Sequence, residues 1–313
     1  MSGSYAIIGT GALGGFYGAR LHRAGMAVHF LLRSDHEHVR RQGLRVESKD
    51  GDFVLPKVNA YSRAEDIPGC DVVLVALKTT QNHLLPALLP PVLKKDGVVL
   101  IIQNGLGMED AVAQIVGPQR VMGGLSFLCS NKVGPGHIRH LDYGAVAFAE
   151  YSPEGKPRGI TDRLRTIGGD FERAGIEVEL IEDLILARWK KLVWNIPYSG
   201  LSVVLNATTD ELMKNPATRE LVVKLMREVV AGAAAVGRAI PDSFIEKMLG
   251  DTNKMPPYRT SMKIDYENRR PMEVESIFGN PVRAAKSAGM ELPRIEMLYQ
   301  QLKFLDNRNR QDG

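Results

Sequence analysis

The segment Tyr5-Ala-Ile-Ile-Gly-Thr-Gly-Ala-Leu-Gly-Gly-Phe-Tyr-Gly18 carries the clearest structural signal in the sequence. Its first four residues are apolar and predict a short buried strand, and its last residues open a predicted helix over residues 16–24. Between the two lie glycines in the spacing G-x-G-x-x-G. The first glycine permits a tight turn, the second lets the backbone approach a pyrophosphate, and the third lets the helix pack closely on the strand. The segment therefore predicts a turn that binds a dinucleotide at a helix N-terminus.

The glycine spacing alone is a weak indicator, because glycine makes up 31 of the 313 residues. Its position directly after an apolar strand and directly before a helix makes it specific. The alternative is an ordinary strand–helix turn whose glycines serve packing only. That interpretation is weaker, because each of the three glycines has a role when a phosphate is bound. The residues predicted to contact the cofactor here are Gly9, Thr10, Gly11, Ala12, Leu13 and Gly14.

Length and composition indicate a soluble globular protein. With 313 residues the chain can form one large domain, and two domains are the better interpretation. Hydrophobic residues make up 44% and charged residues 24%, which is ordinary for such proteins. The formal net charge of +4 is modest, and the basic residues form no long run, so nucleic acid is not indicated as a partner. A small anionic ligand would suit this charge.

Cysteine usage and the N-terminal sequence bear on the cellular compartment. Cys70 and Cys129 are too few for a disulfide framework and lack zinc-site spacing, so we expect free thiols and no bound metal. The first predicted strand begins after only four residues, which leaves no room for a signal peptide. No apolar run reaches the length of a membrane span. We therefore expect a cytoplasmic protein without a membrane partner.

Alternating strand and helix patterns follow the glycine turn. An Asp-Gly turn within residues 49–52 separates two β-rich runs and predicts a hairpin. The alternation predicts a Rossmann-like, doubly wound parallel sheet, which binds ligands at the carboxyl ends of its strands. Strands are predicted at 27–32, 71–77, 97–103, 121–125, 137–150 and 177–181, and helices at 81–93, 109–116 and 161–174.

The end of the second predicted strand bears on cofactor choice. An acidic residue at this point holds the ribose hydroxyls in NAD sites, whereas this chain has Arg33-Ser34 there. A guanidinium and a hydroxyl suit a 2′-phosphate, so NADP(H) is favoured over NAD. Asp35 follows directly, and it keeps NAD open as an alternative.

Two polar residues follow later strands. Lys78 comes after the strand at 71–77, and Asn104 comes after the strand at 97–103. Both are therefore predicted at the ligand-binding edge of the sheet. Lys78 is equally well explained as a surface lysine, and Asn104-Gly105 as a simple turn.

The pattern changes near Asp183, where strand signals become sparse and helical periodicity takes over. We place the domain boundary there, with a cofactor-binding domain over 1–182 and an all-helical substrate or dimerisation domain over 183–313. Thr208-x-x-Glu211 is a candidate capping box. Helices are predicted at 184–205, 209–213, 217–236, 243–249, 271–288 and 293–305, with a frayed tail over 306–313.

The first helix of this second domain carries the candidate catalytic residues. Lys191, Asn195 and Ser199 follow one another at intervals of four residues and share a helix face. Pro197 lies among them and predicts a kink or break. Farther along, Glu273 begins an amphipathic segment, where an acidic residue also suits the helix dipole.

These features together resemble the ketopantoate reductase (2-dehydropantoate 2-reductase) family over nearly the whole chain. The motifs that carry the resemblance are, in order, Gly9-Thr-Gly-Ala-Leu-Gly14, Leu77-Lys78, Gln103-Asn104-Gly105, Trp189-Lys-Lys-Leu192 with Asn195, and Ser261 twelve residues before Glu273. The resemblance implies NADPH-dependent reduction of ketopantoate, a small anionic 2-oxo acid, to pantoate in pantothenate synthesis.

The resemblance also implies roles for individual residues. Lys191 matches the catalytic lysine, and Glu273 matches a glutamate beside substrate and cofactor. The remaining matched positions are substrate-binding Asn195, Ser199 and Ser261, Asn104 at the substrate and cofactor, and Lys78 and Arg33 at the cofactor. The chain departs from the family pattern at Ser199, where a second asparagine is usual, and at Pro197. Chemically, a protonated Lys191 would stabilise the charge that develops on the ketone oxygen and then donate the proton.

Two alternatives remain open at this stage. One is a reductase of the same construction that acts on another small 2-oxo acid, which the departures at Ser199 and Pro197 keep open. The other is a non-catalytic NADP(H)-binding regulator. The combination of Lys191 with the other polar residues argues against a regulator, because a sensor does not need a proton donor. We expect the active site between the two domains, and a homodimer is a possible assembly.

Overall fold

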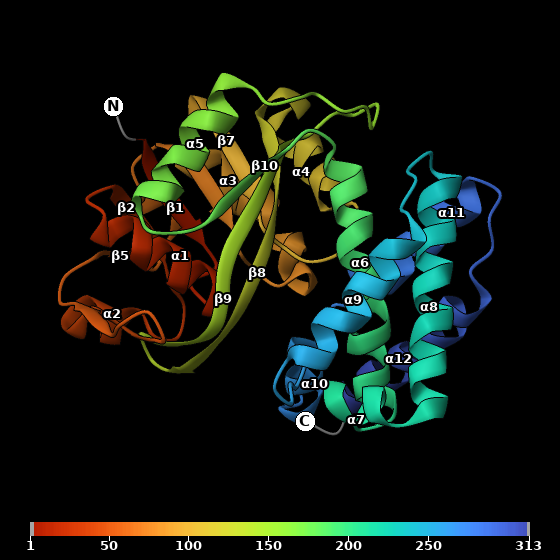
Figure 1. The fold of residues 1–313 in the computed structure, drawn as a ribbon. Coiled ribbons are helices and arrows are strands. Elements are labelled where there is room, and N and C mark those ends of the chain that lie inside the picture. Colours follow the sequence, from red (N-terminus) through yellow and green to blue (C-terminus); the bar gives the residue numbers. More distant parts are fainter. Residues whose placement is uncertain (1–2, 312–313) are drawn as a thin grey trace. The chain divides into compact units, whose positions relative to one another are not determined.

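The computed structural model describes residues 3–311, and these form two compact units. The first unit comprises residues 3–103 and 108–184, and the second comprises residues 104–107 and 185–311. The short segment 104–107 thus belongs to the second unit although the chain on both sides of it belongs to the first. Figure 1 shows the strands in the first unit and a group of helices in the second.

The first unit contains a parallel sheet in which β1, the first strand of the chain, lies in the middle. The parallel strands run in the order β5, β2, β1, β6, β7, β8. Strand order therefore reverses at β1, which makes the carboxyl end of β1 the switch point where such sheets bind ligands. The predicted doubly wound fold is confirmed. The bounds are β1 Ser4–Ile8, β2 Ala27–Leu31, β5 Asn59–Tyr61, β6 Cys70–Val75, β7 Leu93–Ile101 and β8 Val121–Gly134.

Helices connect these strands. Helix α1 begins at Ala12, directly after the glycine turn, which is four residues earlier than its predicted start. The predicted proline-interrupted helix is a 3-10 segment, η2, followed by α3, which accommodates Pro90 and Pro91 in its last turn. The bounds are α1 Ala12–Arg23, α2 His36–Gln42, η1 Ala64–Asp66, η2 Thr79–Leu84, α3 Leu85–Val92, α4 Met108–Val116, η3 Pro118–Arg120 and α5 Asp162–Arg173.

A long antiparallel hairpin extends the sheet beyond the parallel strands. Strand β8 continues to Gly134, nine residues past its predicted end, and pairs with β9 (His137–Glu150). Figure 1 shows this hairpin reaching from the sheet to α2. Strands β3 (Leu44–Ser48) and β10 (Val178–Ile181) both pair with β9 in parallel. The hairpin predicted around the Asp-Gly turn is confirmed, because β3 and β4 (Phe53–Leu55) are antiparallel.

The central strands are apolar on both faces, because consecutive residues are buried along β1 (5–8) and β6 (72–75). Ile7, Phe30, Leu74 and Leu100 have no exposed surface and belong to one continuous core. Burying such a side chain contributes roughly 1.5–3 kcal/mol. The polar turns at the strand ends are thereby fixed in place on a rigid support.

The second unit is helical, as predicted, around a separate apolar core. Of the predicted kink or break at Pro197, the break is wrong, because α6 runs through this residue as one helix. Buried Ile196, Tyr198 and Leu201 on either side pack into the core and hold the helix across the hydrogen bond that proline cannot make. The bounds are α6 Leu184–Val204, α7 Thr209–Lys214, α8 Pro216–Ala235, α9 Asp242–Lys254, α10 Ser261–Glu267, η4 Glu275–Gly279, α11 Asn280–Ser287 and α12 Pro293–Gln311.

Two other helix boundaries differ from those predicted. The tail predicted to fray after Asp306 continues as α12 to Gln311. Asp306 explains this, because its carboxylate accepts the Met272 N–H at 2.8 Å and pairs with Arg310 one turn later. The predicted helix over 271–288 begins with non-helical residues and a π-helical turn, η4. The predicted capping box is confirmed, because the Thr208 N–H donates to Glu211.

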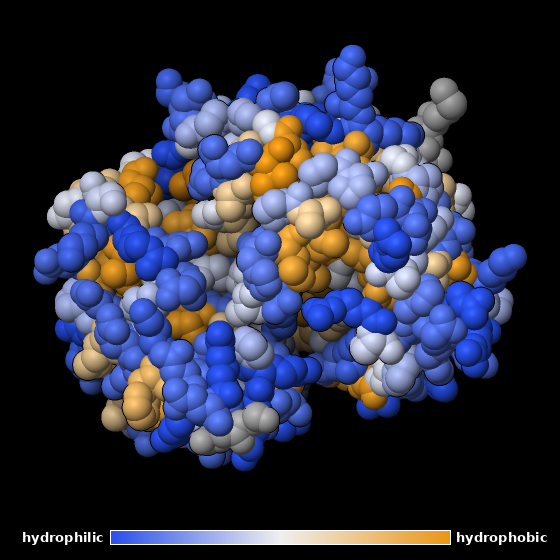
Figure 2. All heavy atoms as spheres, turned by 180° about the vertical axis from the view of Figure 1, so that it is seen from behind, coloured by the Kyte–Doolittle hydropathy of each residue, from blue (hydrophilic) through white to orange (hydrophobic). Residues whose placement is uncertain are grey.

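No helix within residues 3–311 has the length and apolar character needed to cross a membrane. Figure 2 shows one face of the protein, on which hydrophilic residues predominate and apolar residues lie among them.

The three glycines of the turn are explained by two different physical reasons. Gly9 has φ +102°, and a Cβ atom there would lie 2.5 Å from the Leu77 backbone nitrogen. A Cβ atom at Gly14 would lie 2.3 Å from the Gly9 carbonyl oxygen. By contrast, a Cβ atom at Gly11 would meet no atom of the described residues within 4 Å. Packing within the protein therefore requires glycine at 9 and 14, whereas the open space at Gly11 suits a closely approaching ligand.

We expect the two substitutions Gly11→Ala and Gly14→Ala to act differently. Gly11→Ala should leave the melting temperature close to that of the wild type and weaken dinucleotide binding roughly tenfold or more. Gly14→Ala should lower stability by about 1–3 kcal/mol, because the methyl group overlaps backbone. Thermal unfolding and calorimetric titration with the dinucleotide measure both effects. Unchanged dinucleotide binding by a folded Gly11→Ala variant would favour the packing-only interpretation of this turn.

Candidate active site

Helix α6 presents the predicted catalytic lysine and two predicted substrate-binding residues along one face. Lys191, Asn195 and Ser199 are spaced by four residues on an unbroken helix, so their side chains project in similar directions. Asn195 and Ser199 are buried, with 9% and 5% of their surface exposed. Apolar residues of the same helix, among them Leu192 and Ile196, anchor it in the core of the second unit. The helix thus fixes a lysine and two hydrogen-bonding side chains.

Lys191 has unusual electrostatics for a lysine. Burial disfavours the charged amine and lowers its pKa to about 7, and the positive charge of Arg188 lowers it further in the same direction. The Glu273 carboxylate opposes both effects by stabilising the ammonium. A lysine with a pKa near neutrality can hold a proton and release it at the pH of the cell, which suits a general acid.

Arg188 is a site residue that the sequence interpretation missed. It is almost completely buried, with 1% of its surface exposed. It lies three residues before Lys191 on α6, so the two side chains share a helix face. That spacing was the available signal, but basic residues are common on helices and nothing in the sequence indicated burial.

The segment with Glu273 is held by hydrogen bonds on both sides. Asp306 on α12 accepts the N–H of Met272, the preceding residue, and the Glu273 carbonyl accepts the N–H of Ile277 at 3.2 Å. The π-helical turn η4 begins two residues after Glu273. Such turns are rare and are frequent at functional sites. Glu273 is itself buried, with 6% of its surface exposed.

The π-helical turn also holds the segment with Asn104. The Leu106 N–H donates to the Ser276 carbonyl at 2.9 Å, and Asn280 Nδ2 donates to the Leu106 carbonyl at 2.5 Å. Gly105 has φ +107°, and a Cβ atom there would lie 2.4 Å from the Ser276 carbonyl oxygen. Residues 104–107 are therefore fastened to the helices of the second unit. Asn104 Oδ1 is buried and has no hydrogen-bond partner among residues 3–311, so it is available to a ligand.

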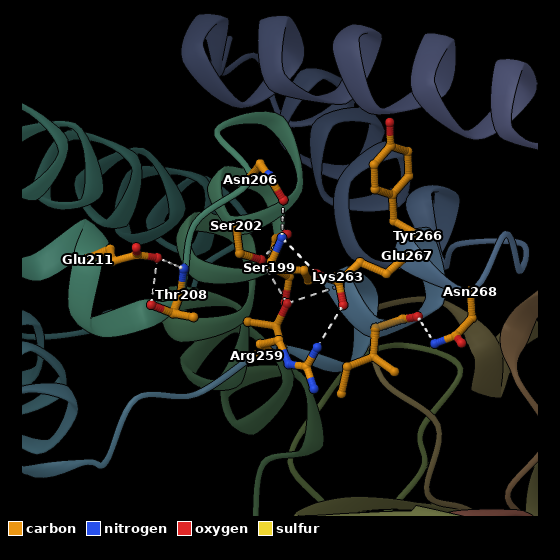
Figure 3. Close-up of polar contacts among 12 residues, drawn as sticks. Ser199, Ser202, Asn206, Thr208, Glu211, Arg259, Lys263, Tyr266, Glu267 and Asn268 are labelled. Atoms are coloured by element: carbon orange, nitrogen blue, oxygen red, sulfur yellow. Dashed lines mark hydrogen bonds and ion pairs between the residues drawn. The ribbon is translucent and has the colours of Figure 1, made fainter.

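Figure 3 shows polar contacts between the part of α6 that carries Ser199 and the start of α10, whose first residue is Ser261. Ser202 Oγ donates to the Ser199 carbonyl at 3.1 Å and lies 2.8 Å from Thr260 Oγ1. Thr260 caps the N-terminus of α10 by accepting the Lys263 N–H. Ser261, the first residue of α10, is exposed. The Ser202–Thr260 contact thus holds the start of α10 against the part of α6 that carries Ser199.

The buried Lys263 makes a second connection between α10 and α6. Lys263 Nζ donates to Asn206 Oδ1 at 2.5 Å and lies 3.1 Å from Glu267 (Figure 3). Asn206 follows the end of α6 and has φ +51°, a conformation that asparagine tolerates better than most residues. Lys263 therefore ties α10 to the end of α6. The sequence interpretation missed this contact because it did not predict α10.

The predicted residues divide between the two units. Lys191, Asn195, Ser199, Ser261, Glu273 and Asn104 all lie in the second unit. Three further residues act on these. Arg188 lowers the pKa of Lys191, Thr260 caps the helix that begins with Ser261, and Asn280 donates a hydrogen bond to the segment that contains Asn104. The first unit holds the glycine turn together with Arg33 and Lys78, both of which are exposed.

The first unit places its predicted cofactor residues at the carboxyl ends of strands. Arg33 follows β2, and its Nη1 lies 3.5 Å from Gln81 Oε1. Lys78 precedes η2 as its N-cap residue. Ser34 is exposed beside Arg33, whereas Asp35 is buried. Residues 3–311 contain no group of three or more His, Cys, Asp or Glu side chains that could hold a metal ion.

Comparison with known proteins bears on this arrangement. Residues 5–153 match the family model of ketopantoate reductase PanE/ApbA, and residues 183–306 match the model of its C-terminal part. A 2-dehydropantoate 2-reductase from Nostoc is 64% identical over 306 residues, which cover 98% of this chain and 96% of that protein.

Solved structures that resemble this chain include members of the same family. The crystal structure of a 2-dehydropantoate 2-reductase from Geobacter metallireducens has a TM-score of 0.92 and 41% identity and covers 97% of this chain and 99% of that one. A second, from Methylococcus capsulatus, has a TM-score of 0.88 and 34% identity over 98% and 97% of the two chains. The chain is therefore a dinucleotide-binding oxidoreductase, and it belongs to the ketopantoate reductase family.

Proposed function

We propose that this protein reduces 2-dehydropantoate (ketopantoate) to pantoate with NADPH, in pantothenate synthesis, and that Lys191 is the general acid. The observation that carries the proposal is the partly buried Lys191, whose pKa is lowered to about 7 by desolvation and by the charge of Arg188 and supported by the Glu273 carboxylate. The 64% identical relative, named as a 2-dehydropantoate 2-reductase, supports the choice of substrate. The open space at Gly11 and the exposed Arg33 support the choice of cofactor.

In this proposal the residues of the second unit stabilise charge and supply a proton. NADPH supplies the hydride that adds to the ketone carbon. Negative charge then develops on the ketone oxygen, where the Lys191 ammonium stabilises it and transfers its proton to form the hydroxyl group. Glu273 keeps part of the lysine population protonated by raising its pKa against the effects of burial and Arg188.

The other polar residues would orient the substrate. Asn195 and Ser199 offer hydrogen bonds from the same face of α6, and Ser261 offers a hydroxyl from the start of α10. The Asn104 amide supplies a buried oxygen without a partner in the described chain, which suits a hydroxyl donor. Fixed hydrogen bonds of this kind reduce the entropy that the substrate loses on reaching the transition state. Glu273 and Lys78 are further candidate contacts of the cofactor.

The direct test is NADPH oxidation at 340 nm with a panel of 2-oxo acids that includes ketopantoate, with NADH in parallel. We expect efficient turnover of ketopantoate and a preference for NADPH. Stronger turnover of another acid would contradict the proposed substrate and connect the departure at Ser199 with a different pocket. Binding of NADPH without turnover of any acid would instead favour a regulator.

Lys191→Ala should lower kcat by roughly 10²- to 10⁴-fold, because the proton donor and the positive charge are both lost. Binding of NADPH, measured by calorimetric titration, should stay close to that of the wild type. Lys190→Ala is the matched control, since Lys190 is the neighbouring lysine on the same helix. Unchanged turnover of Lys191→Ala would remove this residue from the mechanism.

The pH dependence of kcat/KM tests the electrostatics of Lys191. The protonated amine is the acid, so reduction should fall about tenfold per pH unit above a pKa near 7. Arg188→Met should move this decline to higher pH, because it removes a positive charge that lowers the pKa of Lys191. Glu273→Gln should move the decline to lower pH. Shifts in the same direction for both variants would contradict this account.

A further inference from the structure

Arg33, Ser34 and Asp35, which lie shortly after the end of β2, differ in exposure. Arg33 and Ser34 are exposed, whereas Asp35 directly after them has only 6% of its surface exposed. Asp35 is the N-cap residue of α2, a position where an aspartate usually accepts a backbone N–H of its own helix. Its side chain accepts no such bond here. The Asp35 carboxylate instead binds residues outside its own helix.

The tip of the β8–β9 hairpin binds the Asp35 carboxylate. Lys132 Nζ on β8 lies 2.6 Å from Asp35 Oδ2, and the Gly136 N–H in the turn donates to the same oxygen at 3.1 Å. Burial by itself would raise the pKa of Asp35, but the hydrogen bonds and the charge of Lys132 outweigh it and keep the pKa below its usual value. The carboxylate is therefore ionised, buried and paired with the hairpin.

A carboxylate at the end of β2 is important for cofactor choice. In NAD sites an acidic residue near this point accepts the ribose hydroxyls, and a negative charge there repels a 2′-phosphate. Glu37, the next acidic residue along the chain, is paired with Arg40 and Arg41 on its own helix. With Asp35 neutralised by Lys132, the Arg33 guanidinium gives this tip a positive character that suits a phosphate.

We propose that Lys132 is a specificity-determining residue, which favours NADPH over NADH by binding and neutralising Asp35 behind the Arg33-Ser34 tip. The inference rests on the proposed function, because it takes NADPH as the cofactor of this protein. Lys132 acts through Asp35 and need not touch the cofactor. The pair also fastens the hairpin to α2, and the test must separate this structural effect from the electrostatic one.

The expected effects follow from Coulomb's law. An unpaired charge within roughly one Debye length of a doubly charged phosphate, in a dielectric close to that of water, changes binding roughly three- to tenfold at low ionic strength. Lys132→Met leaves the Asp35 carboxylate unpaired and should weaken NADPH binding by this factor. Asp35→Asn leaves the Lys132 ammonium unpaired and should strengthen NADPH binding by a similar factor. NADH lacks the 2′-phosphate, so its binding should change less than about twofold.

The experiment measures the dissociation constants of NADPH and NADH by calorimetric titration at low ionic strength, in parallel with thermal unfolding. The variants are Lys132→Met, Asp35→Asn and the double variant of both. The control is Lys49→Met, which removes the lysine of a similar 2.6 Å ion pair with Asp142 on the surface of the same unit. We expect the ratio of NADH to NADPH dissociation constants to fall in Lys132→Met, to rise in Asp35→Asn, and to return near the wild-type value in the double variant.

A purely structural role gives a different result. Both single variants would then weaken NADPH and NADH equally and leave the ratio unchanged, which would overturn the inference. If Lys132→Met does not fold, Asp35→Asn and the double variant decide the question, and a ratio that does not rise in Asp35→Asn overturns it. A wild-type protein that binds NADH as tightly as NADPH would contradict the proposed cofactor itself, which is a separate failure.

Discussion

A protonated amine loses hydration when it is buried, and this loss governs the chemistry of Lys191. The pKa of an exposed lysine is above 10, so that it would release its proton too reluctantly to act as an efficient acid near neutral pH. Burial and the charge of Arg188 bring the pKa of Lys191 to about 7, while Glu273 limits the decrease. One helix, α6, supplies the lysine and the arginine, and the segment before η4 supplies the glutamate. The remaining structure of the second unit keeps these three charges in place.

That support comes from contacts between segments far apart in the chain. Asp306 fixes the residue before Glu273, and the π-helical turn after it binds residues 104–107. Thr260 and Ser202 hold the start of α10 against α6. Each contact holds a segment that carries a candidate site residue. A rigid framework of this kind is what oriented hydrogen bonds and a preorganised charge require.

The sequence predicted the parts of the fold whose signals are local. The glycine turn, the apolar strands, the Asp-Gly hairpin and the Thr208 capping box each depend on a few neighbouring residues, and the structure confirms them. Pro197 was predicted to kink or break α6, and the helix does not break there, because core packing of its neighbours outweighs the missing hydrogen bond. The helical tail after Asp306 was missed because its partner, Met272, lies elsewhere in the sequence. The length of β8 was missed although its partner β9 follows directly in the same hairpin.

For the candidate site as well, local sequence motifs identified some residues, whereas contacts between distant segments could not be predicted. The family motifs supplied Lys191, Asn195, Ser261 and Glu273, and their roles remain predictions. The burial of Arg188 and the inward orientation of Asp35 could not be predicted, because they depend on which residues lie nearby in space. The assignment of residues 104–107 to the second unit likewise depends on Asn280 and Ser276, which are far away in the chain.

The proposed reaction is a direct transfer of hydride from NADPH to the ketone carbon of a 2-oxo acid. The most direct measurement uses NADPH that carries two deuterium atoms at C4 of the nicotinamide, with ketopantoate in ordinary water, and analysis of the product by mass spectrometry and NMR. The account predicts pantoate with one deuterium atom bound to C2 and none exchanged with solvent. Pantoate without deuterium at C2, or the absence of pantoate, would contradict it.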